Sequence, residues 1–140
     1  MDEAKLLELL VKLGYIKKED ALKAQREKEK DEDIISALLR FNFIDDAKLI
    51  DFYQKYMPQR LWKGTLEEIN LPEDIKKKLP EGFLRKHNIA PVKYERSEDG
   101  KLQKLHIVTI NPFNQTAINE LRFKTKIDIV IPYVGTKKTI

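Results

Sequence analysis

The chain contains no cysteine, which excludes a disulfide framework, a thiolate zinc site and a thiol nucleophile. Histidine occurs only as His87 and His106, and neither stands in a pattern that gathers metal ligands. The five glycines form no phosphate loop, dinucleotide-binding motif or nucleophile elbow. Since no catalytic constellation remains, we expect a protein that is not an enzyme and that uses no cofactor or metal.

Long apolar runs are also missing. No stretch approaches the length needed to span a bilayer. The start, MDEAKLLELLVKLG, is acidic before its apolar run and lacks the cationic beginning and cleavage site of a signal peptide. We therefore expect a soluble cytoplasmic protein.

Charge is distributed unevenly along the chain. Residues 1–57 carry a net charge of −2 and residues 58–140 a net charge of +6. The basic half concentrates cations at Lys76, Lys77, Lys78, Arg85 and Lys86. These could attract an acidic protein, a lipid headgroup or RNA, although a solvated helix face also explains them. Nucleic acid is not the expected partner, because stacking aromatics and a recognisable binding motif are missing.

Residues 1–57 consist of two copies of one helical pattern, 28 residues apart. Each copy has an apolar stripe at helical spacing, then Gly14 or Asn42, which tolerate a positive φ, and then a second helix. The second helix of the first copy is expected around residues 21–30, and Asp45 is expected to cap that of the second copy. Neither helical pair can bury its apolar stripe alone, so the pattern predicts a four-helix repeat bundle. The stripes comprise Leu6, Leu9, Leu10 and Leu13 in the first copy and Ile34, Ile35, Leu38 and Leu39 in the second.

The second half reads as mixed α and β structure. Pro72 and Pro80 suit the starts of two short helices, and strand-like runs at 89–95 and 101–110 flank an Asp-Gly turn signal. A helix follows, capped by Asn111 or Asn114 with Pro112 at its start, and then a third strand. Because a strand–helix–strand passage implies a crossover, the second and third strands should be parallel.

These elements predict an α+β chain with three parts. A four-helix repeat bundle at 1–57 is followed by a connector at 58–72 and by a small α-β-β-α-β domain at 73–140. Trp62 is the one large aromatic of the connector. We expect it to pack the connector onto a neighbouring surface, with ligand stacking as the alternative.

Residues 71–134 resemble the N-terminal domain of type II secretion and type IV pilus assembly ATPases. The resemblance rests on LPEDIKKKLPEGFLRKHNIAPVKY and, after the hairpin, INPFNQTAINELRFKTKIDIVIPYV. Asn111 stands where that family usually has Asp, and Lys126 where it usually has Gly. The resemblance implies a module that docks its motor onto the cytoplasmic part of an inner-membrane platform, with the ATP-hydrolysing half beyond residue 140. Trp62, Lys76, Lys77 and Arg85 are the candidates for binding that protein partner.

The helical half resembles the tandem repeats of the same family, which bind cyclic di-GMP in some members. The resemblance implies ligand contacts at Lys5, Leu6, Leu10, Gly14, Ile34, Leu38 and Asn42. The apolar positions are kept, but Asp33 replaces an Arg, and Leu7 and Ile35 replace glycines whose backbone would approach the ligand. We therefore expect a docking and regulatory module, with a cyclic di-GMP sensor as the alternative and nucleic-acid binding through the cationic helices as a third hypothesis. The third predicts affinity that falls steeply with salt.

Overall fold

The structure is a computed structural model, and it describes residues 2–62 and 71–135. The chain divides into two compact units, Met1–Pro58 and Gln59–Ile140. The first is called the helical unit below and the second the mixed unit, and each is described by itself. Together they confirm the predicted α+β class, with helices first and a three-stranded mixed sheet after them.

The helical unit contains α1 (Glu3–Lys12), α2 (Lys18–Glu27), α3 (Ile34–Arg40) and α4 (Asp46–Tyr56). Its core takes equivalent side chains from the two copies of the repeat, because the apolar stripes face inward. Leu13 is the exception, since it lies at the C-terminal end of α1 and is exposed. The helix α2 begins and ends three residues before the expected 21–30 range, since the chain becomes extended at Lys28. The equivalent buried pairs, 28 residues apart, are Leu6 and Ile34, Leu7 and Ile35, Leu10 and Leu38, Ile16 and Ile44, Ala21 and Leu49, and Ala24 and Phe52.

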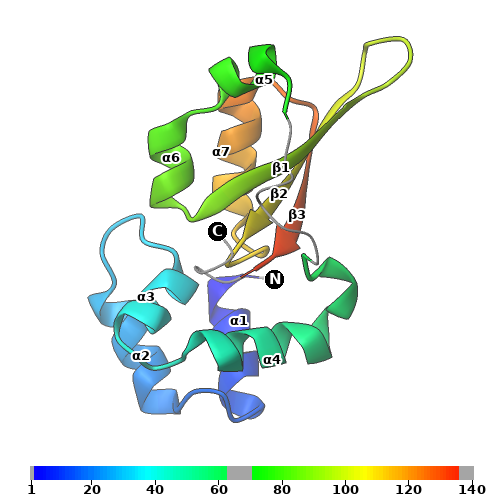
Figure 1. The fold of residues 1–140 in the computed structure, drawn as a ribbon. Coiled ribbons are helices and arrows are strands. Elements are labelled where there is room, and N and C mark those ends of the chain that lie inside the picture. Colours follow the sequence, from blue (N-terminus) through cyan, green and yellow to red (C-terminus); the bar gives the residue numbers. More distant parts are fainter. Residues whose placement is uncertain (1, 63–70, 136–140) are drawn as a thin grey trace. The chain divides into compact units, whose positions relative to one another are not determined.

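The mixed unit begins with a short 3-10 helix, η1 (Pro58–Arg60), which straddles the boundary between the units. It continues with α5 (Glu73–Lys78), α6 (Glu81–Lys86), β1 (Ile89–Arg96), β2 (Gln103–Thr109), α7 (Gln115–Thr125) and β3 (Ile129–Val134). The predicted order of two short helices, two strands, a helix and a third strand is confirmed. Figure 1 shows these elements in chain order by colour.

The sheet has the order β1-β2-β3, which makes β2 the central strand. Strand β2 pairs antiparallel with β1 and parallel with β3, so the predicted parallel pairing is confirmed. Pro91 and Pro132 lie in the two edge strands, where the missing N–H removes no hydrogen bond from the centre of the sheet. The tip of the β1–β2 hairpin projects beyond the helices (Figure 1) and contains Gly100 at a φ of +72°.

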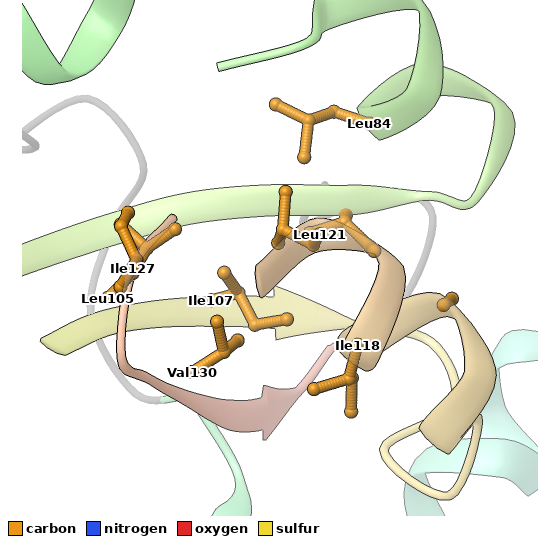
Figure 2. Close-up of a cluster of buried hydrophobic side chains, with 9 residues drawn as sticks. Leu84, Leu105, Ile107, Ile118, Leu121, Ile127 and Val130 are labelled. Atoms are coloured by element: carbon orange, nitrogen blue, oxygen red, sulfur yellow. The ribbon is translucent and has the colours of Figure 1, made fainter. Parts of the chain in front are cut away.

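One face of the sheet is covered by α7, and α6 contributes to the same core. Leu105 and Ile107 of β2 and Val130 of β3 pack against Ile118 and Leu121 of α7 (Figure 2). Leu84 of α6 joins this cluster. The alternation of β2 therefore sends Leu105 and Ile107 to one face and His106 to the other.

The start of α7 differs from the sequence-based expectation. Of the two candidate caps, Asn114 is the one that is used, because its side-chain oxygen accepts a 3.1 Å hydrogen bond from the Ala117 N–H. Asn111 is buried and accepts from the Phe113 N–H instead. The placement of Pro112 at the helix start was wrong, since the helix begins at Gln115.

Candidate functional site

A surface hollow of about 790 Å³ lies beside α1 and α2 in the helical unit. Leu7, Ala21, Leu22 and Tyr56 are among its apolar lining residues, and Lys5 is among the charged ones. Leu22 and Tyr56 are 54% and 45% exposed. Of the predicted cyclic di-GMP contacts, Lys5 is the one that lines this hollow.

Four of the other predicted ligand contacts lie inside the core of the helical unit. Leu6, Leu10, Ile34 and Leu38 are at most 3% exposed. Leu7 and Ile35, which stand where the resembling repeats have glycines, are buried to the same degree. These side chains therefore serve packing, and a ligand could touch all of them except Leu7 only after the core had opened. Leu7 also lines the surface hollow, where its side chain stands in place of the glycine backbone of the resembling repeats.

The last two predicted contacts, Gly14 and Asn42, end α1 and α3 in the same way. Their φ angles are +84° and +61°. The Gly14 N–H donates to the Val11 carbonyl and the next N–H to the Leu10 carbonyl, at 3.0 and 2.9 Å. In the second copy, the Asn42 N–H donates to the Leu39 carbonyl at 3.1 Å, and the N–H of the following residue donates to the Leu38 carbonyl at 2.9 Å. Both positions therefore complete a Schellman motif, which satisfies carbonyls at the helix end.

Asp33 caps α3, because its Oδ1 accepts from the N–H groups of Ile35 and Ser36 at 2.8 and 3.3 Å. In α1 this role belongs to Asp2, whose Oδ1 accepts from the Lys5 N–H at 2.8 Å. The first helix thus begins farther from its Gly14 end than α3 does from Asn42, so Lys5 sits inside a helix while its repeat partner sits before one. The two copies cannot offer a ligand the same charge or backbone at this position.

The cations predicted to bind a protein partner lie at the ends of the short helices. Lys76 and Lys77 are in the last turn of α5, and Arg85 is in the last turn of α6. All three are exposed, and Lys76 lies 3.5 Å from Glu73 in an exposed ion pair. Their positive charge complements the helix dipole at a C-terminus, which is a local role compatible with contact to an acidic partner.

Trp62 packs against β3, within the mixed unit. Its backbone N–H donates a 3.0 Å hydrogen bond to the Val134 carbonyl, and its ring meets the Tyr133 ring edge-on at 5.6 Å. The indole Nε1 is buried and has no hydrogen-bond partner among the described residues. The expected packing role of Trp62 is therefore seen in its contact with the third strand.

His106 lies on the sheet face away from α7 and stacks on Tyr133 at 5.8 Å. Its Nε2 donates a 3.0 Å hydrogen bond to the Glu95 carboxylate, because a carboxylate can only accept. That bond, followed by the one from Lys93, holds the pKa of Glu95 below its ordinary value. His106 and Glu95 thus form a pair on the sheet. The other histidine, His87, packs against Phe83 of α6 instead.

A family model for the MshEN domain matches residues 64–140, which is more than half of the chain. The chain belongs to the MshEN domain family. The match spans the elements of the mixed unit from α5 to β3 described above. It confirms the resemblance that the sequence of residues 71–134 carries.

Solved structures extend the likeness of this MshEN chain to both units. The N-terminal domain of XpsE matches with a TM-score of 0.68 at 18% identity, covering 98% of this chain and 89% of that chain. A second crystal form of that domain gives a TM-score of 0.56 at 20% identity, covering 99% and 91%. The structure of MshE with cdg gives 0.55 at 20% identity, covering 96% and 91%. These identities establish a shared fold, and a search among curated proteins finds no match.

Sequence reasoning missed three features of the MshEN chain. Phe123 of α7 is 86% exposed, although its residue type indicates burial. A two-pronged ion pair joins Arg40 to Glu32, with both N–O distances at 2.8 Å, and it lowers the pKa of Glu32. A hydrogen bond joins Tyr15 to Asp51 across the two repeats. The one sequence signal for the Tyr15–Asp51 hydrogen bond is that an aromatic residue, Tyr15 or Phe43, follows the first helix end in each copy.

Within residues 2–62 and 71–135, no three acidic or histidine side chains gather in a way that could hold a metal ion. In the same part of the chain, no helix combines the length and apolar character of a membrane span.

Proposed function

We propose that this MshEN chain is a non-catalytic docking and regulatory module of a type II secretion or type IV pilus ATPase, and that it binds the cytoplasmic part of an inner-membrane platform protein. The observation that carries the proposal is the match to the N-terminal domain of XpsE over 98% of the chain, together with membership in the MshEN family. The module acts in the cytoplasm, where partner binding repositions an attached motor.

The electrostatics of the mixed unit support a protein partner. Lys76, Lys77 and Arg85 are exposed cations on two neighbouring helices in the chain. An acidic partner surface would be steered toward them, and the association rate would fall as salt screens the charges. The buried state of Leu6, Leu10, Ile34 and Leu38 supports a packing role for the repeats in the same module.

The experiment is a titration of the full chain with the cytoplasmic domain of its cognate platform protein, followed by calorimetry. We expect a saturable complex that weakens when Lys76, Lys77 and Arg85 are all changed to Glu. A variant with Lys17, Lys23 and Lys30 changed to Glu carries the same change in net charge on the helical unit and serves as the control. No complex at high micromolar concentrations would contradict the docking function.

A second candidate function is cyclic di-GMP binding, favoured by the match to the structure of MshE with cdg. It would use Lys5 and the hollow beside α1 and α2. The buried leucines and the cap role of Asp33 argue against it. Calorimetry with cyclic di-GMP tests it, and heat that saturates and disappears in Lys5→Ala would favour the sensor over the docking module.

A further inference from the structure

Phe123 is the large apolar side chain that projects farthest into solvent among the described residues. It is 86% exposed, and Leu22 follows at 54%. The helix α7 buries its other side, where Ala117, Ile118 and Leu121 face the sheet. Phe123 therefore lies at the centre of the solvent-exposed face of α7 and contributes no packing to the fold.

Cations flank Phe123 on both sides. Successive residues of a helix are separated by about 100° around its axis, so Arg122 and Lys124 stand on either side of the ring. Lys126 follows one turn later, and all three cations are exposed. The acidic residue near them on this face is Glu120, whose carboxylate lies 4.0 Å from the Lys124 ammonium. Arg122 and Lys126 form no ion pair with any described residue.

An exposed aromatic ring beside cations that form no ion pair with the described residues, here Arg122 and Lys126, is a combination that protein interfaces use. Aromatic anchors that enter a pocket of the partner dominate binding, and surrounding charges select a partner of opposite sign. We propose that the solvent face of α7 is a docking surface for an acidic protein that receives Phe123 in an apolar pocket. This inference rests on the proposed docking function and names the surface and the chemistry of the partner.

A protein fits this face better than a lipid surface does. A helix that lies in a membrane interface presents a broad apolar face to the acyl chains. The broad apolar face of α7 is already covered by the sheet, and the solvent face around Phe123 has polar Thr116, Asn119 and Glu120. One ring can fill one pocket, but it cannot supply the area that interfacial insertion uses.

The test compares matched substitutions within the mixed unit. Phe123→Ala removes the anchor, and Leu102→Ala removes another exposed apolar side chain, 49% exposed, near the hairpin turn. Arg122→Glu reverses a flanking charge, and Lys101→Glu reverses an exposed charge in the hairpin. Because these side chains are exposed, all four variants should unfold at nearly the temperature of the unmodified chain, which circular dichroism checks.

The binding probe is the cytoplasmic domain of the cognate platform protein, titrated by calorimetry at two salt concentrations. We expect Phe123→Ala to weaken the Kd about thirtyfold, as for an interface anchor, and Leu102→Ala to leave it unchanged. Arg122→Glu should weaken binding and reduce its salt dependence, whereas Lys101→Glu should do neither. Such a pattern supports both the docking function and this surface.

Other outcomes separate the two ideas. Tight binding by the unmodified chain that Phe123→Ala leaves intact would overturn the surface and keep the docking function. No binding by the unmodified chain would overturn the docking function and, with it, the inference that depends on it. Co-sedimentation with vesicles of mixed phosphatidylglycerol and phosphatidylethanolamine, lost in Phe123→Ala, would assign the face to lipid and overturn the protein partner.

Discussion

The hydroxyl of Tyr15 donates a 2.6 Å hydrogen bond to Oδ2 of Asp51, joining the turn between the two helices of the first repeat to the last helix of the second. The Tyr15 ring also meets the Phe52 ring edge-on at 5.6 Å. Asp51 accepts a second contact from Lys55 at 3.1 Å. The hydrogen bond from Tyr15 is the largest cause that lowers the pKa of Asp51, and the same bond raises the pKa of Tyr15.

We predict that Tyr15→Phe lowers the Tm of the chain at neutral pH while keeping the ring contact with Phe52. Because the folded pKa of Asp51 is lowered, its contribution is present above an ordinary pKa of about 3.9 and is lost as pH falls through the folded value. Because the folded pKa of Tyr15 is raised, its contribution is present below about 10 and is lost as pH rises through the folded value. The Tm difference should therefore be widest between about pH 4 and 10.

Thermal unfolding followed by circular dichroism across that range provides the measurement. Asp51→Asn and the double variant complete a mutant cycle that isolates the pair. Additive effects of the two single substitutions would show that the hydrogen bond does not couple the repeats.

We predict that Leu38→Ala lowers the free energy of unfolding by about 2–5 kcal/mol, because its side chain is fully buried and its removal leaves a cavity. Leu13→Ala, at a position 52% exposed, should change it by less than about 0.5 kcal/mol. Urea titration measures both. Equal effects would contradict the placement of the second repeat's stripe in the core.

The role of Asp33 is tested by restoring the residue type that the resembling repeats have there. We expect Asp33→Arg to lower the free energy of unfolding by about 1 kcal/mol, because the N-cap of α3 is lost. Asp33→Asn keeps an oxygen that can accept from the Ile35 N–H and should be nearly neutral. If Asp33→Arg instead raised stability and gave saturable heat with cyclic di-GMP, the capping assignment would be secondary to a ligand site.

Two substitutions, expected to change the free energy of unfolding in opposite directions, test the residues that end helices in the left-handed backbone conformation. Lys126→Gly should raise the free energy of unfolding by up to about 1 kcal/mol, since Lys126 has a φ of +59°. Gly14→Ala should lower it by about 1–2 kcal/mol through the backbone alone, since no atom lies within 4 Å of an added Cβ. Chemical denaturation of the two variants gives the values. The same sign for both would mean that contacts outweigh the backbone preference.

The parts of the fold that could be predicted from the sequence are those fixed by local chemistry or chain topology. Gly14 and Asn42 tolerate a positive φ, Asp99-Gly100 favours a tight hairpin, and the crossover through a helix makes β2 and β3 parallel. Pro112 was misplaced because proline suits both a first helical turn and the loop before it.

The candidate site was less accessible to prediction. The alignment of Lys5 with Asp33 matched apolar stripes, but it could not show that α1 starts earlier and takes Asp2 as its cap. The contact of Trp62 with Tyr133 joins residues far apart in the chain, which no local pattern records. The exposure of Phe123 was not predicted, because a phenylalanine in an amphipathic helix ordinarily indicates a buried core position.

The pairing of β3 with β2 also imposes an order on folding. The β1–β2 hairpin closes through a turn of a few residues, so it can form early and on a microsecond scale of about 1–10 μs. Strand β3 reaches its place only after α7 has crossed the sheet, and the Leu61–Val134 bridge closes a far longer loop still. During synthesis on the ribosome, one edge of β2 would therefore stay unpaired until β3 has emerged. In this interval the nascent chain is most prone to incorrect strand pairing.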